Sequence, residues 1–181
     1  MLLSVALAVL GLAACGSARH PYDATAENNG FYVKGGPVEY QLQVSRALNP
    51  FEIEDHQYLT GLPSGTARPK SDEFWYGVFL WAQNKGKSSQ NTSDSFAIVD
   101  TQGNRYYPVQ LDPTVNQYAW KSQTLAPLET QPGLDDTATG GPTGGALVLF
   151  KLPTAVYANR PLTLELNIPG CSTPSTISLD L

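Results

Sequence analysis

Apolar and polar residues alternate through much of this chain, and this pattern most constrains what it can fold into. Near one end, polar residues separate the apolar side chains Val38, Tyr40, Leu42 and Val44. The same alternation holds at 162–168 and 177–181. Because successive side chains of a strand point to opposite faces, a period of two predicts strands with one face on a core. Strands buried in parallel sheets are apolar throughout, so the alternation favours antiparallel sheets.

Other parts of the chain also favour strands rather than helices. The runs rich in β-favouring residues are 74–83, 95–99, 105–111 and 146–152. The best helical candidate, residues 52–59, is short and ends at Gly61. Residues 131–145 are interpreted as a long loop rich in Gly and Pro. We therefore predict an all-β chain, an antiparallel immunoglobulin-like β-sandwich of seven to eight strands.

The N-terminus carries a targeting signal. Residues 2–14 form an uncharged apolar run, whose helix would rise about 20 Å against a bilayer core of about 30 Å. This length, followed by small residues, is typical of a secretory signal peptide. Residues 12–16, Leu-Ala-Ala-Cys-Gly, resemble the lipobox of bacterial lipoproteins. The resemblance implies that the Cys15 thiol receives a diacylglycerol and that cleavage occurs just before it, with acylation (palmitate or a similar chain) of the new amine.

An alternative to this anchor stays open. The basic residue that usually starts such a signal is missing, since the first Lys or Arg is Arg19. An ordinary signal peptide, cleaved elsewhere, would release a secreted protein. Lipidation of Cys15 would also take up the one possible disulfide partner of Cys171. We interpret Cys171 as a loop residue rather than a nucleophile, because neither a His nor a helix N-terminus lies near it in the sequence.

These features divide the chain into three parts. We expect a lipoprotein signal peptide at 1–14, a flexible spacer after the lipidated cysteine at 15–36, and the β-sandwich domain at 37–181. The protein is then expected on the extracytoplasmic face of the cell membrane, held by a lipid anchor.

The hairpin and return strand carry a family resemblance. The motif Phe-x-x-x-Asp-x-x-Gly-x-x-Tyr is met by Phe96, Asp100, Gly103 and Tyr106, and a later Phe-x-x-Pro by Phe150 and Pro153. These residues resemble a family of secreted bacterial domains with a telokin-like, immunoglobulin-type sandwich. With the lipobox, the chain is similar to actinobacterial lipoproteins of unassigned function. The resemblance implies the sandwich fold over about 38–181, and it brings no agreed activity and no catalytic residues.

Composition excludes several classes of protein. The chain has 181 residues, a net charge of −5 and only 2 cysteines. The length suits a single domain. A nucleic-acid-binding protein would need a basic face, and a disulfide scaffold would need many more cysteines. We expect no nucleic acid partner and no cofactor.

One polar cluster could support chemistry. Glu52, Glu54, Asp55 and His56 could hold a divalent metal, or His56 could serve a hydrolase. The nearest serine motif, at 61–65, is not Gly-x-Ser-x-Gly, and the spacing does not fit a calcium loop. The interpretation we prefer is a solvated first turn of a short helix, where acids favour the helix dipole.

The strand at 74–82 is aromatic on both faces. Trp75, Phe79 and Trp81 alternate with a second apolar set. Either another segment covers the second face, or this face is a binding surface for a partner. We accordingly expect an envelope protein that acts as a binding or scaffolding module rather than as an enzyme, with an envelope protein or glycan as partner. The alternative is a hydrolase or metal-binding protein that uses the His56 cluster.

Overall fold

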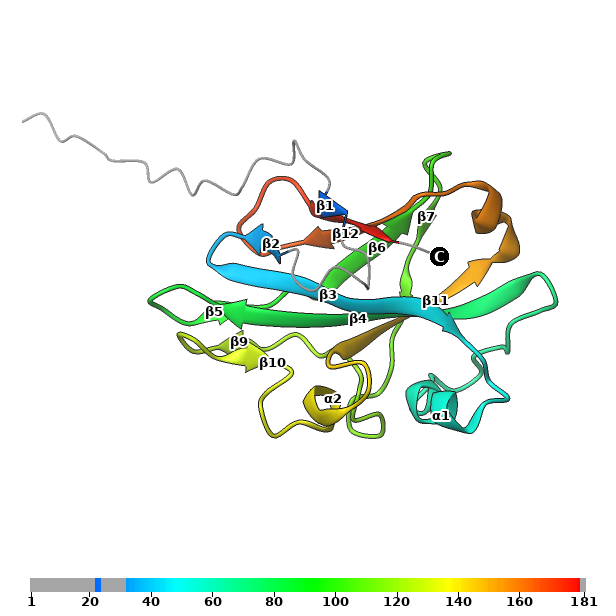
Figure 1. Ribbon diagram of the computed structural model, residues 1–181, viewed down its shortest axis with the longest axis horizontal. Helices are drawn as coiled ribbons and strands as arrows, with labels where there is room; N and C mark the ends of the chain where they lie inside the picture. Colours follow the sequence, from blue (N-terminus) through cyan, green and yellow to red (C-terminus); the bar gives the residue numbers. More distant parts are fainter. Residues whose placement is uncertain (1–21, 24–31, 180–181) are drawn as a thin grey trace, which may run out of the picture.

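The computed structural model describes Tyr22–Asp23 and residues 32–179, which form two main β-sheets packed face to face (Figure 1). The first sheet has the order β1 (Tyr22–Asp23), β13 (Ser175–Leu179), β12 (Leu162–Asn167), β6 (Ser95–Val99) and β7 (Arg105–Tyr106). The second has the order β2 (Tyr32–Gly35), β3 (Val38–Leu48), β4 (Glu73–Asn84), β11 (Ala146–Pro153) and β8 (Pro108–Val109).

Short elements complete the fold. A further strand, β10 (Thr130–Gln131), pairs with β4, and β5 (Gln90–Asn91) pairs with β9 (Thr124–Leu125). The helical turns are α1 (Ile53–His56), η1 (Gln57–Leu59), α2 (Thr137–Gly140) and η2 (Thr154–Ala158). The all-β antiparallel sandwich is thus confirmed. The number of strands is larger than expected, because two-residue strands such as β5 and β9 leave no alternation in the sequence.

The predicted spacer contains strand structure. Tyr32–Gly35 forms β2 and pairs antiparallel with β3, and Gly36 takes a φ of +67° in the turn between them. Glycine adopts this conformation without steric cost, which explains the tight hairpin at this point. The predicted signal peptide and Cys15 lie outside the described residues.

The main core lies between the two sheets. Its central side chains come from both layers and are fully or almost fully buried: Tyr40, Tyr76, Val78, Leu80, Ile98, Phe150, Leu162, Leu164, Leu166 and Ile177. The alternation at Leu162, Leu164 and Leu166 thus places one face of β12 on the core, as predicted. Burial of this apolar area is the main driving force for the sandwich.

A bulge in β3 changes which face its side chains occupy. Leu42 pairs with Leu80, but the next register is Val44 with Phe79, so Gln43 is the extra residue. An inserted residue places each later side chain of the strand on the opposite face of the sheet from the one that the alternation predicts. Val44 therefore packs with Phe79 on the opposite face from Leu42, although the sequence pattern predicted one shared face.

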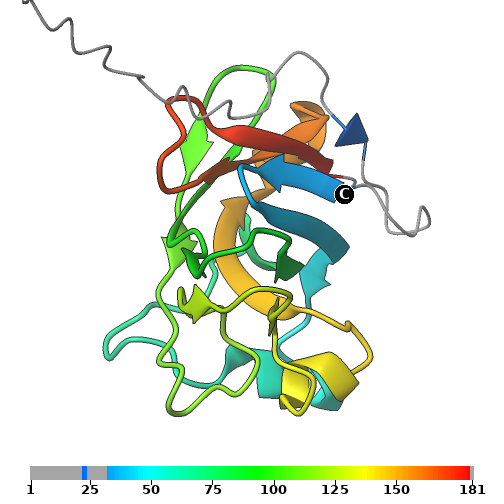
Figure 2. The same ribbon diagram turned by 90° about the vertical axis from the view of Figure 1, so that its left-hand side faces the viewer.

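A second apolar cluster, which we call the outer cluster, lies on the far face of the second sheet. It consists of the buried residues Leu48, Tyr58, Trp75, Phe79, Leu147 and Leu149. It is covered by what we call the outer layer, residues 49–72 and 110–120. In Figures 1 and 2, α1 and α2 lie on this side of the sheet, opposite the first sheet.

Hydrogen bonds join the two segments of the outer layer. The Asn116 side-chain amide donates to the carbonyls of Tyr58 and Thr60 at 3.1 and 3.0 Å, and the Asp112 N–H donates to the Gly61 carbonyl at 2.8 Å. Gly61 has a φ of +68°, and a Cβ there would lie 2.8 Å from the Asp112 oxygen. Gly61 therefore ends the helical turn as predicted and also permits close contact between the segments.

The outer layer decides between the two alternatives for the aromatic strand, in favour of a second face covered by another segment. Trp75 is 3% exposed and Phe79 is 0% exposed, so the face they share with Trp81 is not an open binding surface. Trp81 is half-buried. The aromatic strand is apolar on both faces because it is a middle layer, with the first sheet on one side and the outer layer on the other.

The hairpin motif of the sequence has a physical role. One carboxylate oxygen of Asp100 accepts the N–H groups of Gln102 and Asn104, each at 2.9 Å, and the other accepts the Tyr106 hydroxyl at 3.1 Å. Desolvation opposes ionisation of Asp100, but these hydrogen bonds, with those from the side chains of Asn104 and Asn159, outweigh it and lower its pKa to about 2. Asp100 thus fixes the turn between β6 and β7.

Two truncations test whether β4 is buried on both faces. Phe79→Ala and Leu80→Ala, on opposite faces of the strand, should lower the free energy of unfolding by about 3–5 and 2–5 kcal/mol respectively. Urea denaturation of both variants measures this. A Phe79→Ala variant as stable as the wild type would show that the outer layer does not cover the sheet.

Candidate functional site

A pocket of about 730 Å³ opens where β3 ends and β4 begins. Its apolar lining comes from both strands and from the outer layer: Leu48, Pro50, Phe51, Leu59, Leu62, Pro69, Phe74 and Trp75. The polar residues on its lining are His56, Thr66, Arg68, Lys70 and Glu73. The volume lies in the range of sites for small organic molecules, which are concave and mostly apolar. We call this the α1 pocket.

The bulge of β3 helps to form the α1 pocket. Because the register shift turns the end of β3 over, Leu48 faces the outer layer and pairs with Trp75 on β4. Both side chains are 3% exposed. They form a buried apolar floor, whereas Leu59 and Leu62 of the outer layer are half-buried.

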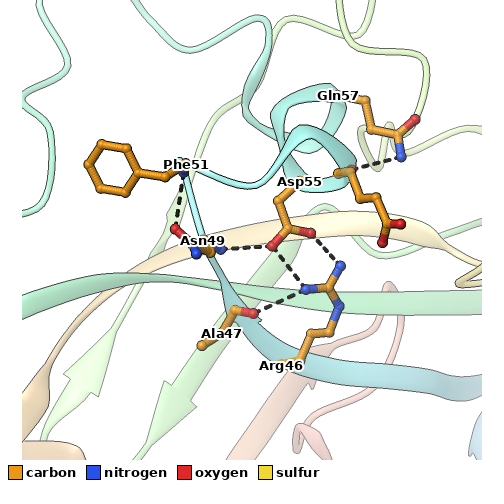
Figure 3. A network of polar contacts seen from close by, with 7 residues as sticks. Arg46, Ala47, Asn49, Phe51, Asp55 and Gln57 are labelled. Atoms are coloured by element: carbon orange, nitrogen blue, oxygen red, sulfur yellow. Dashed lines mark hydrogen bonds and ion pairs between the residues drawn. The ribbon is translucent and has the colours of Figure 1, made fainter.

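An ion pair holds α1 against the sheet. The Asp55 carboxylate accepts two hydrogen bonds from the Arg46 guanidinium, at 3.1 and 2.5 Å, and a third from the Asn49 N–H at 2.7 Å (Figure 3). Desolvation opposes ionisation, but these contacts outweigh it and lower the pKa of Asp55. A bidentate pair of this kind fixes geometry as well as charge. It fixes the orientation of the turn that carries one side of the pocket.

Figure 3 also shows how this turn presents its apolar residues. Phe51 points away from the Arg46–Asp55 pair, and its N–H donates to the Asn49 side-chain carbonyl at 3.0 Å. Phe51 is 85% exposed and Ile53 is 87% exposed. Two large apolar side chains therefore lie in solvent on the segment that borders the pocket.

The predicted metal cluster is not formed. The buried Asp55 uses its oxygens for Arg46 and Asn49, while Glu52, Glu54 and His56 are exposed. Among residues 22–23 and 32–179, no group of three or more His, Cys, Asp or Glu side chains is placed to hold a metal ion. The four side chains do not gather at one point, because Asp55 turns inward to pair with Arg46 while the other three face solvent.

The pocket also lacks the parts of the predicted hydrolase. His56 Nε2 lies 2.6 Å from the Pro50 carbonyl, so it donates its proton there and only Nδ1 remains as a base. The pocket lining holds neither serine nor cysteine, and its one hydroxyl belongs to Thr66. Within the described part of the chain, no hydrogen bond joins Thr66 to His56. A nucleophile aligned with its base is the minimum for that chemistry.

The acidic residue on the pocket lining, Glu73, already has a hydrogen-bond donor and a positively charged neighbour. Glu73 accepts the backbone N–H of Lys70 at 3.1 Å, and its carboxylate lies 3.6 Å from the Lys151 Nζ. The hydrogen bond from the Lys70 backbone is the largest cause that lowers the pKa of Glu73, and the charges of Lys151 and Lys70 add to it. Glu73 is therefore a carboxylate, with its charge offset by its neighbours.

Sequence reasoning missed most of this site. It singled out His56 and Trp75 but not Arg68 or Lys70, which stand in an irregular loop without a motif. It also left Leu59 and Leu62 aside, since apolar residues in a loop give no periodic signal. The one available signal was the doubly apolar β4, which required a covering segment.

Cys171, which we interpret from the sequence as a loop residue, lies in the described part of the chain. It is half-buried and disulfide-bonded. The only other cysteine in the sequence, Cys15, lies outside the described residues. A sulfur in a disulfide cannot also carry a thioether-linked lipid, so a Cys15–Cys171 disulfide and the predicted lipidation of Cys15 would exclude each other.

No protein-family model matches this sequence, and no curated protein matches it significantly. Solved structures do share its fold. The YjhA protein of Bacillus subtilis superposes with a TM-score of 0.52 at 15% identity, over 83% of this chain and 97% of that one. YcdA of Bacillus subtilis, described as a candidate lipoprotein, gives a TM-score of 0.50 at 13% identity, over 84% of this chain and 39% of that one.

A β-sandwich protein of Clostridium difficile is also similar, with a TM-score of 0.46 at 14% identity, over 91% of this chain and 99% of that one. At such identities, the first two comparisons show a shared fold and nothing of function. In the part of the chain that the structure describes, no helix is long and apolar enough to span a membrane.

Removal of the Asp55 carboxylate should loosen the pocket wall. Asp55→Ala should lower the free energy of unfolding by about 1–3 kcal/mol at neutral pH, because Arg46 and the Asn49 N–H lose their acceptor. The matched control Glu54→Ala, at an exposed neighbour, should change it by less than about 0.5 kcal/mol.

The pH dependence follows from the lowered pKa of Asp55. Its stabilisation is fully present above the ordinary carboxyl pKa of about 3.9 and is lost as pH falls through the lower folded-state value. The difference between wild type and Asp55→Ala should therefore shrink in acid, as measured by urea denaturation at pH 7 and below 4. A constant difference would contradict the ion pair.

Proposed function

We propose that this protein is a lipid-anchored, extracytoplasmic envelope protein whose β-sandwich is a binding module rather than an enzyme. The α1 pocket carries this proposal, because it combines a buried apolar floor with a polar rim. Such pockets hold small molecules by burial of apolar surface, and a few polar groups at the edge set their orientation.

The lining of the pocket favours binding over catalysis. The single histidine on it, His56, donates Nε2–H to a backbone carbonyl, and the acidic residue Glu73 is paired with Lys151. Neither group is left in the arrangement that acid–base or nucleophilic chemistry requires. The binding site is the α1 pocket, which includes Trp75 of the predicted aromatic surface but neither Phe79 nor Trp81.

The N-terminal sequence supports the anchor. Cys15 follows an apolar run and the residues Leu-Ala-Ala, as in a lipobox. Two or more acyl chains at one end of the chain would give stable membrane attachment, which a single chain does not. The anchor would keep the pocket next to the membrane and to the lipids, glycans and proteins of the envelope.

Mass spectrometry of protein from native membranes tests the anchor. We expect a mature N-terminus at Cys15 with the mass of a diacylglycerol and an acyl chain, and we expect Cys15→Ala to leave the membrane fraction. An unmodified Cys15, or a Cys15–Cys171 disulfide in place of the lipid, would contradict it.

Blocking the α1 pocket tests the binding function. Leu62→Trp adds a large side chain to the pocket lining, whereas Leu128→Trp places the same side chain at a position that is 69% exposed and outside the pocket. Native mass spectrometry should detect a bound small molecule on wild type and Leu128→Trp, and none on Leu62→Trp. Equal occupancy of all three proteins, or none on any, would rule out the pocket as a binding site.

A further inference from the structure

We propose that the α1 pocket binds an anionic amphiphile with one hydrocarbon chain: the chain lies on the apolar floor and the acidic head group lies at Arg68 and Lys70. This inference rests on the proposed function, since it names the class of ligand for the same pocket.

The floor suits a hydrocarbon chain. Leu48 and Trp75 provide buried apolar surface, and Leu59, Leu62 and Phe74 add half-buried surface around it. An apolar cavity of about 150 Å³ holds benzene, so a pocket of about 730 Å³ has room for a chain of about a dozen carbons. Each further methylene that the floor buries should tighten binding about three- to fourfold.

The rim is basic in an acidic protein. The chain has 11 Lys and Arg against 16 Asp and Glu, yet two of the polar lining residues are the exposed cations Arg68 and Lys70. Neither forms an ion pair with another side chain of residues 22–23 and 32–179. The only carboxylate on the lining, Glu73, is paired with Lys151. The local charge therefore complements an anionic head group.

The entrance carries further apolar surface. Phe51 lines the pocket and is 85% exposed. On another side, Tyr157 is 46% exposed and stacks on the lining residue Phe74 with 5.2 Å between ring centroids. Single exposed apolar residues are ordinary, but Phe51 lies on the lining of the apolar pocket and Tyr157 extends the apolar surface of the lining residue Phe74. A ligand that is itself partly apolar would contact Phe51 as it enters.

A photoreactive probe tests this on the full-length protein in its native membranes. A twelve-carbon carboxylate with a diazirine near the end of its chain is added, irradiated and mapped by peptide mass spectrometry. We expect labels on the pocket residues Leu59, Leu62, Phe74 and Trp75. Dodecyl phosphate should compete about tenfold better than dodecyltrimethylammonium, since it has the same chain and the opposite charge.

Matched variants separate the head group from the chain. Arg68→Glu with Lys70→Glu should reduce labelling about tenfold, whereas Lys85→Glu with Lys87→Glu, the same change at exposed lysines outside the pocket, should not. The Leu62→Trp variant should abolish labelling. A lysophospholipid competitor that matches dodecyl phosphate would indicate a membrane lipid as the source, and a weaker one would indicate a free fatty acid.

The failures are distinguishable. If the pocket is labelled but anionic and cationic competitors act equally, the anionic head group is wrong and the pocket still binds. If labelling stays unchanged in Leu62→Trp, or never falls on the pocket lining, the probe partitions without a site. The proposed binding function then fails together with this inference.

Discussion

A strand that is apolar on both faces must be covered on both faces, and the rest of this structure follows from that constraint. In β4, Tyr76, Val78 and Leu80 face the first sheet while Trp75 and Phe79 face the other way. A two-layer sandwich covers only the first set. The chain covers the second with irregular segments rather than with another sheet, and these segments become the outer layer.

Irregular segments cover a sheet less evenly than strands do, which explains where the α1 pocket lies. The outer layer is joined internally by Asn116 and attached to the sheet by the Arg46–Asp55 pair. Between these attachments and the start of β4, the covering residues Leu59 and Leu62 leave a space over Trp75. The need to bury an aromatic strand and the presence of a binding pocket therefore have one structural origin.

The sequence predicts this fold better than it predicts the site, for physical reasons. Period-two alternation identifies strands such as β12, because each leucine in the pattern lies on the buried face of the strand and each polar residue between them lies on the other face. The bulge at Gln43 leaves no such signal, since Val44 continues the alternation while its side chain changes face. Nor can the sequence tell which acid among Glu52, Glu54 and Asp55 turns inward, because that depends on Arg46, a neighbour in space. The sequence also gives no sign that Arg68 and Lys70 belong to a site, because only the fold places them beside the apolar floor of the pocket.

A crystal structure of the protein grown with dodecyl phosphate tests the central claim most directly. The account predicts hydrocarbon density over Trp75 and Leu48, phosphate within reach of Arg68 and Lys70, and residues 49–72 packed on β4. An outer layer detached from the sheet, with Trp75 and Phe79 open to solvent and no ligand between them, would contradict it.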